Sequence, residues 1–204
     1  MGRPRGMEDA VILRAAAQVM GRVGPAGLTL AAVAGEVGLV PGTLVQRFGS
    51  KRGLLLALAD WSAQEASETA ERVLQSHDSA LGALAALTVE SMAVMATPET
   101  YANHLAFLCM DLADPQLHKR ALAVHRAQTR AIEGLLSEAA GTGELRAGTD
   151  VAALARTVQA ITAGAGLTWA LERRGTLKQR LRHELTTVLC PHVPPRHEQK
   201  LEAT

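Results

Sequence analysis

The sequence predicts an all-α protein of about nine helices, and three observations carry this prediction. Apolar residues recur at helical spacing along nearly the whole chain, and no two segments alternate as a pair of strands would. Aromatic residues make up only 2% of the 204 residues, which leaves little material for sheets. Hydrophobic residues make up 48%, so the chain can bury a sizeable core.

The first helix is expected to follow the N-terminal Gly- and Pro-containing segment and to stop at the Gly-Pro-Ala-Gly sequence of residues 24–27. Its apolar positions obey the i, i+3, i+4, i+7 rule, which predicts an amphipathic helix with one buried face. These positions are Val11, Ile12, Ala15, Ala16, Val19, Met20 and Val23.

Two short helices and a long one are expected next. Thr29 can cap the second helix, and Gly38 ends it where a left-handed residue is needed. Pro41 fits the first turn of a third helix over residues 41–48. Ser50 can cap the long fourth helix.

The remaining chain predicts five more helices and a tail. The helices are expected at 78–95, 98–112, 115–140, 150–173 and 177–190, and Pro191 closes the last of them. We therefore expect an N-terminal domain over residues 1–52, a helical body over 53–190 and a polar tail over 191–204 that is mobile.

The net charge of +1 hides an uneven distribution. Residues 1–52 hold seven basic and three acidic side chains, whereas the rest of the chain holds 14 basic and 17 acidic ones. A basic N-terminal part on a mildly acidic body favours a polyanionic partner for that part. Chance asymmetry is the alternative, because the charges are few.

Residues 29–48 have the spacing of a helix-turn-helix, in which the second helix enters the DNA major groove. Gly38 supplies the tight turn, and apolar residues of both helices would lock them together. Thr43, Gln46 and Arg47 would project from the second helix. The same pattern also fits a plain α-hairpin within a helical bundle, so both interpretations stay open on the pattern alone.

A longer motif runs through residues 12–55. It consists of Ile12-Leu13, Ala16, Gly24, Leu28-Thr29-Leu30, Val33-Ala34, Val37-Gly38-Leu39, Gly42-Thr43-Leu44, Phe48-Gly49-Ser50-Lys51 and Leu54-Leu55. In order and spacing this motif resembles the TetR family of bacterial transcriptional regulators. The resemblance implies a homodimer whose N-terminal three-helix domain binds operator DNA and whose C-terminal helical domain binds a small effector molecule and dimerises.

The resemblance also implies roles for single residues at the DNA. Thr29, Thr43 and Lys51 are similar in position to phosphate contacts. Gln46 and Arg47 are similar in position to base readers, since Gln can pair with adenine and Arg bidentately with guanine.

Other positions would lie close to the DNA by the same resemblance. Pro41 and Gly42 are at the helix start, where small residues allow close approach, and Leu39 in the turn would touch a thymine methyl group. Arg3 and Arg5 would form an arm for the minor groove or the backbone. A disordered chain start is the alternative for these two arginines.

The sequence departs from the family pattern at three positions. Val45 stands where a tyrosine usually touches a phosphate, Val40 where a capping serine or threonine is common, and Gly53 where a glutamate would complete a capping box. By the resemblance, the hydroxyl groups that are missing at positions 40 and 45 would normally bind phosphates. Such contacts position the helix rather than read bases. DNA binding is therefore expected either to be weaker or to depend more on Arg47, Lys51 and the N-terminal arm.

The helix expected over 98–112 carries the candidate effector site, because it mixes apolar walls with a few polar groups on one stripe. With nearby residues, the candidate set is Trp61, Met92, Met95, Tyr101, His104, Phe107, Leu108, Met110, Asp111 and Trp169. The effector is expected to be mostly apolar with one or two polar groups, a cation facing Asp111 being one option. A plain core is the alternative for each of these residues.

The last two helices are expected to form the dimer interface, as the resemblance implies. Small residues crowd the helix over 150–173, which suits close approach of another helix. The expected interface residues are Leu154, Val158, Ile161, Gly164, Leu181, Leu185 and Val188. A close crossing within one chain is the alternative.

Other function classes find little support. No nucleophile elbow, P-loop or dinucleotide-binding glycine motif is present, so we expect no enzyme and no cofactor. His118 and His125 are about two helical turns apart, too far to chelate one metal ion. Two cysteines, no signal peptide and no long apolar run favour a cytoplasmic protein without a membrane span. A helical small-molecule carrier or enzyme without a DNA role, or a protein–protein adaptor, are the alternative functions.

Overall fold

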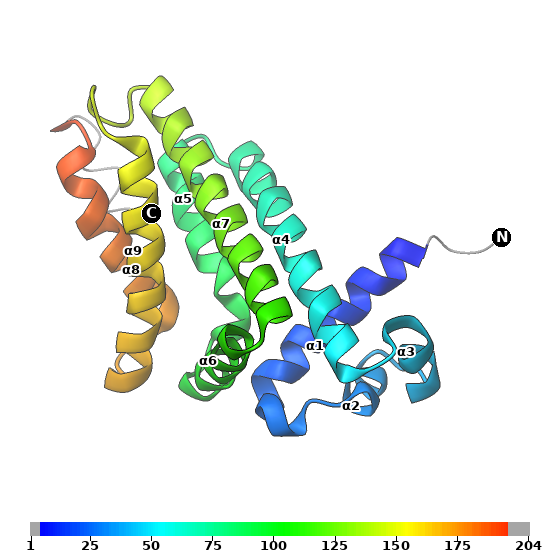
Figure 1. The fold of residues 1–204 in the computed structure, drawn as a ribbon. Coiled ribbons are helices and arrows are strands. Elements are labelled where there is room, and N and C mark those ends of the chain that lie inside the picture. Colours follow the sequence, from blue (N-terminus) through cyan, green and yellow to red (C-terminus); the bar gives the residue numbers. More distant parts are fainter. Residues whose placement is uncertain (1–4, 196–204) are drawn as a thin grey trace. The chain divides into compact units, whose positions relative to one another are not determined.

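Figure 1 shows the computed structural model of the chain, which describes residues 5–195. Within these residues it contains nine α-helices, two short 3-10 helices and no strands, which confirms the all-α prediction. In order they are α1 (Arg5–Gly27), α2 (Leu30–Glu36), α3 (Pro41–Phe48), α4 (Lys51–Gln75), α5 (Ala80–Ser91), η1 (Ala93–Met95), α6 (Pro98–Ala113), α7 (Pro115–Gly141), α8 (Val151–Glu172), α9 (Leu177–Leu189) and η2 (Cys190–His192).

The chain forms two compact units. The first consists of residues 1–64 and 99–124, and the second of residues 65–98 and 125–204. The first unit therefore extends to residue 64, within α4, and does not end after residue 52 as we expected. The helix that carries the candidate effector stripe, α6, groups with the N-terminal helices.

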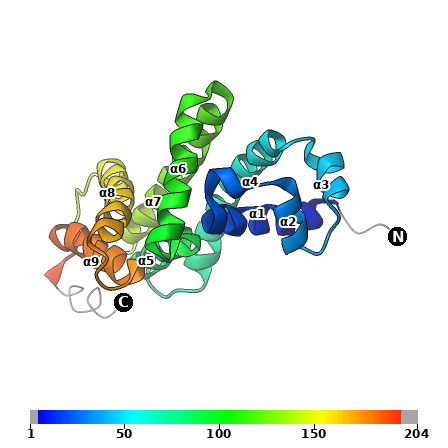
Figure 2. The same ribbon diagram turned by 90° about the horizontal axis from the view of Figure 1, so that it is seen from below.

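The first unit has its own apolar core, in which α2 packs against both α1 and α3 (Figure 2). The core residues come from α1 to α4 and α6, and are Ile12, Leu13, Ala16, Val19, Leu28, Val33, Ala34, Leu44, Leu54, Leu58 and Phe107. The stripe predicted for the first helix supplies much of this core. Val11 and Val23, also on that stripe, are exposed.

The helix α1 breaks at Gly24, whose φ of 65° and ψ of −174° are not helical. The expected stop thus occurs, although helical structure resumes and runs to Gly27. In a regular helix the carbonyl of Gly21 would accept a hydrogen bond from residue 25, but Pro25 has no N–H. Asn103 of α6 supplies a donor instead, with its Nδ2 atom 2.8 Å from the Gly21 oxygen.

The second unit is built around α5, α8 and α9 with the later parts of α4 and α7. Its helices start at well-formed caps: Asp150 accepts from the Ala153 N–H, and Thr176 and Gln179 form a capping box. The helices α8 and α9 lie side by side in Figure 1 and pack closely.

Two expected helix ends are corrected here. The helix expected over 78–95 ends at Ser91, and residues 93–95 form the separate 3-10 turn η1. The helix α9 ends at Leu189, and Pro191 lies within η2.

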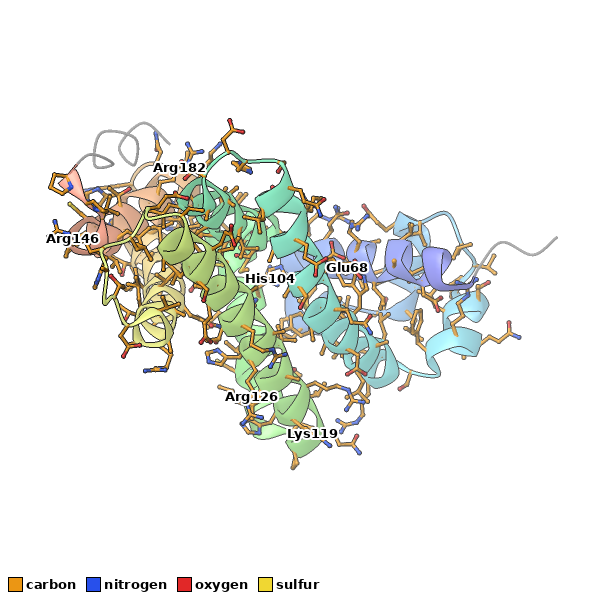
Figure 3. The ribbon with its side chains drawn as sticks, turned by 90° about the horizontal axis from the view of Figure 1, so that it is seen from above. Glu68, His104, Lys119, Arg126, Arg146 and Arg182 are labelled. Carbon is orange, nitrogen blue, oxygen red and sulfur yellow. The ribbon has the colours of Figure 1, made fainter. Side chains whose placement is uncertain are left out.

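The tail was also expected to begin too early, because residue 193 still packs into the second unit. Val193 is fully buried in the second unit, and its carbonyl accepts a hydrogen bond at 3.0 Å from the side chain of Arg146, which is labelled in Figure 3. The rest of the expected tail, residues 196–204, lies outside the described residues.

Candidate nucleic-acid interface

The two short helices α2 and α3 are joined by the turn that the sequence predicts. The Thr29 side chain accepts a hydrogen bond from the Ala32 N–H at 3.0 Å, which fixes the start of α2. Gly38 has a φ of 68°, a value that residues with a β-carbon rarely adopt. The turn then closes with the Leu39 N–H donating to the Ala34 carbonyl at 2.9 Å, and Pro41 opens α3.

Packing fixes which face of α3 points outward. Leu44 is fully buried against Val33 and Ala34 of α2 in the core of the first unit. At 100° per residue, the positions opposite Leu44 are Gly42 and Gln46, and both are exposed. The outward face of α3 is therefore free to meet a partner along its length.

Two predicted DNA-contacting residues have partners on α1 in this structure. Arg47 donates to the Asp9 carboxylate of α1 at 2.8 Å. Lys51 donates to the Pro25 carbonyl at 2.5 Å. Both contacts hold a cationic side chain beside the helix-turn-helix. The sequence contains no local signal for either pairing, since both partners come from α1.

The other expected DNA-binding residues are placed as follows. Leu39, Pro41 and Gly42 are exposed and Thr43 is half-buried. Arg3 lies outside the described residues. Arg5 is the first residue of α1, and its side chain is not among those described.

All three departures from the family pattern have structural consequences. Val45 is exposed on α3, and Val40 is exposed at its start, so both add apolar surface to the outward face. A β-carbon on Gly53 would lie 1.9 Å from the Phe48 carbonyl oxygen, so the glutamate common in the family does not fit this backbone. Ser50 nevertheless caps α4 by accepting from the Gly53 N–H at 3.1 Å.

Polar contacts also tie the turn between α6 and α7 into this unit. The Arg52 guanidinium donates to both oxygens of Asp114, which also accepts from the backbone N–H groups of Gln116 and Leu117 at 2.9 and 3.1 Å. These donors, the Arg52 guanidinium first, hold the pKa of Asp114 well below its usual range. The start of α7 is thereby fixed to the start of α4.

The stripe expected on α6 is only partly inward-facing. Tyr101 is buried, and His104 and Asp111 are half-buried, whereas Leu108 and Met110 are exposed. Burial raises the pKa of the Tyr101 hydroxyl and lowers that of the His104 imidazole. Burial, together with the nearby Asp114 charge, raises the pKa of Asp111. The inward groups on α6 are therefore costly to charge.

His104 carries an unsatisfied atom. Its Nε2 is shielded from solvent and has no hydrogen-bond partner within the described part of the chain. A buried polar nitrogen without a partner carries a desolvation cost that a bound polar group would relieve.

The remaining effector candidates fall into different surroundings. Phe107 belongs to the core of the first unit, and Trp61 packs on that core with the Arg14 guanidinium 5.8 Å from its ring centre. In the second unit Trp169 is buried and donates to the Gly175 carbonyl at 3.2 Å, and Met92 and Met95 are half-buried. Phe107 and Trp169 thus have structural roles of their own.

The expected dimer residues need correction. Leu154, Val158, Leu181 and Leu185 are buried within a single chain, so they offer almost no surface to a partner. Ile161 and Val188 are half-buried and Gly164 is exposed. The helical period identified the apolar face of α8 and α9, but that face packs inside the second unit.

The described residues hold neither a metal-ligand cluster nor a membrane-spanning helix. No group of three or more His, Cys, Asp or Glu side chains there is placed to hold a metal ion. None of the helices in residues 5–195 combines the length and the apolar character needed to cross a membrane.

Two family models match the chain. Residues 12–58 match the model for bacterial regulatory proteins of the tetR family, and residues 106–185 match the tetracyclin repressor-like C-terminal domain. No curated protein matches the chain.

Solved structures show the same fold. SmeT, the repressor of the multidrug efflux pump SmeDEF of Stenotrophomonas maltophilia, is 22% identical with a TM-score of 0.64, and the match covers 92% of this chain and 91% of SmeT. A TetR transcription regulator from Haloarcula marismortui is 14% identical with a TM-score of 0.70, covering 93% and 100%. The fatty acid degradation regulator FadR from Bacillus halodurans is 15% identical with a TM-score of 0.65, covering 92% and 97%.

Proposed function

The chain belongs to the TetR family of bacterial transcriptional regulators, and from this premise we propose that it is a repressor. It binds a DNA operator as a homodimer and leaves the operator when a small, largely apolar effector binds. It works in the cytoplasm, where bacterial operators lie, and needs neither a cofactor nor a catalytic step.

The observation that carries the proposal is the outward face of α3. The turn at Gly38 and the buried Leu44 present Gln46 and Arg47 to solvent on the helix that enters the major groove in helix-turn-helix proteins. Gln46 suits adenine and Arg47 suits guanine. In a dimer the two α3 helices would read half-sites one DNA turn apart, about 34–36 Å.

The test begins with selection of bound sequences from a random DNA pool by the full chain, followed by binding measurements on the recovered operator. We expect Arg47→Ala to weaken operator binding by about 1–3 kcal/mol, the value of one bidentate base contact. The matched control is Arg126→Ala, since Arg126 is an exposed arginine of α7 in the second unit (Figure 3). Equal losses for both variants would show a nonspecific charge effect and contradict the base-reading role.

The homodimer is supported by an exposed stripe on α8. Ala160, Gly164, Leu167 and Leu171 recur at i, i+4, i+7 and i+11, so they share one face of the helix. Leu167 and Leu171 are 45% and 77% exposed in the single chain. Small residues beside exposed leucines suit close packing of α8 against a second copy.

We expect Leu171→Glu to give a monomer in sizing chromatography and to lose operator binding, because it places a charge in the apolar interface. Leu112→Glu on α6 is the matched control, since Leu112 is similarly exposed at 59% and should leave the dimer intact. A dimeric Leu171→Glu protein would place the interface elsewhere.

The effector site is supported by the inward groups of α6. The unsatisfied Nε2 of His104 would receive a hydrogen bond from a polar group of the effector, while buried neighbours such as Tyr101 supply apolar contact. Because burial raises the pKa of Asp111, a cationic group on the effector would lower that pKa again. An effector releases the operator only through its different affinities for the two states of the protein.

A panel of hydrophobic compounds can be screened for thermal stabilisation of the protein and for release of the operator. We expect His104→Ala to weaken the response to an active compound at least tenfold, and Leu112→Ala, whose side chain is exposed on the same helix, to leave it unchanged. An equal response of wild type and His104→Ala would remove His104 from the site.

A further inference from the structure

The outward surface of α3 is divided into an apolar and a polar half. Relative to the buried Leu44, helical geometry places Pro41 and Val45 on one side and Thr43 and Arg47 on the other. Val40, the residue just before the helix, has an extended backbone and adds a further apolar side chain at the start of α3.

This apolar half is strongly exposed. Val40 is 69% and Val45 is 51% exposed, and Leu39 in the turn is also exposed. Single exposed apolar side chains are common on proteins, but here three of them and a proline fall within seven consecutive residues of the element that would face DNA. Neither valine can donate or accept a hydrogen bond through its side chain.

The position of these side chains limits what can cover them. The first residues of the second helix in a helix-turn-helix contact base edges in the major groove. The polar half of the same helix, with Gln46 and Arg47 exposed and Lys51 close behind, fits DNA rather than an apolar protein surface. The apolar group that base pairs present in the major groove is the C5-methyl of thymine.

We propose that Val40 and Val45 read thymine methyl groups, so that each operator half-site contains thymines whose methyls determine specificity. This inference rests on the proposed function and extends to α3 the contact expected of Leu39. It also gives the departures at positions 40 and 45 a physical role, since a side chain that cannot bind a phosphate gains a base contact instead.

The test uses the full chain and the operator recovered by selection. Each thymine of the operator is replaced in turn by deoxyuridine, which keeps base pairing and removes only the methyl group. We expect substitution at the contacted positions to weaken binding about fourfold per half-site, the value of transferring one methyl group from water into an apolar contact. Substitution at the other thymines should have no effect.

Two variants then assign the contact. In Val45→Ala or Val40→Ala the deoxyuridine effect should disappear at the thymine that the altered valine touches, because the partner of the methyl group is gone. Val94→Ala, at an exposed valine of η1 in the second unit, should keep the full effect. Since these valines are exposed, the variants are expected to fold, and circular dichroism checks this.

The outcomes separate this inference from the proposed function. If the selection recovers no DNA, the proposed function fails and the inference fails with it. If the protein binds the operator equally well with thymine and with uracil at every position, the inference is overturned while the proposed function stands. A protein partner then becomes the candidate for covering the apolar half. If the deoxyuridine effect survives unchanged in both valine variants, another residue reads the methyls and the assignment is overturned.

Discussion

The bond from Asn103 to the broken end of α1 allows a quantitative prediction. The carbonyl of Gly21 has no donor at residue 25 because that residue is proline, and Gly21 itself is buried. The Asn103 Nδ2 atom at 2.8 Å replaces the missing donor. In Asn103→Ala the carbonyl keeps its buried position and loses this partner.

The expected cost follows from the chemistry of the carbonyl. Leaving a buried acceptor without a donor costs about 1–3 kcal/mol, which is more than the net value of an ordinary hydrogen bond. We therefore expect Asn103→Ala to lower the free energy of unfolding by about 2 kcal/mol. Both residues belong to the first unit, so the loss should appear in the unfolding transition of that unit.

Urea unfolding of the full chain, followed by circular dichroism, measures this loss by linear extrapolation. Gln18→Ala is the matched control, since it removes an amide side chain from an exposed position of α1 and should change stability by less than about 0.5 kcal/mol. If the free energy of unfolding of Asn103→Ala also changes by less than about 0.5 kcal/mol, the Gly21 carbonyl has found another partner and the reasoning from Pro25 is refuted.

Three further predictions concern the same unit. Because the pKa of Asp114 is lowered in the folded chain, its contribution to stability is present above about pH 4 and is lost as the pH falls below that value. In urea titrations Asp114→Asn should therefore lose less stability than the wild type between about pH 4 and 2, and an unchanged pH profile would contradict this. Burial lowers the pKa of His104, so the unfolded chain takes up a proton at higher pH than the folded chain, and stability should fall as the pH drops below about 6.5. His104→Gln should reduce that fall; if the variant loses stability with pH as steeply as the wild type, other groups cause the fall. Phe107→Ala should cost about 3–5 kcal/mol in unfolding experiments, since Phe107 lies in the core of the first unit, and a loss below about 1 kcal/mol would mean that the site is not packed.

Local chemistry made much of the fold predictable from the sequence. The cap at Thr29, the left-handed turn at Gly38 and the start of α3 at Pro41 all appear where the sequence predicts them. Each depends on the preferences of one residue and its next few neighbours, which are present in the sequence itself. The helix-turn-helix and the residues exposed on α3 follow from these signals.

The helical period was informative about faces but not about what covers them. Leu185 and Val158 lie on the apolar faces that the sequence identifies, yet they pack inside one chain rather than against a second copy. Periodicity states that a stripe is apolar, and both a core and an interface satisfy that condition. The exposed leucines of α8 became visible only once the neighbours of that helix were known.

The sequence by itself determined the order of the helices, the helix-turn-helix and the family, because these rest on short-range preferences and on a contiguous motif. Only the tertiary structure decided the partners of Arg47 and Lys51 on α1, and the bond of Asn103 to the carbonyl that Pro25 leaves open. These pairs join residues 26 to 82 positions apart. No local preference encodes such a pairing, because it arises from the packing of whole helices, which brings donor and acceptor within reach.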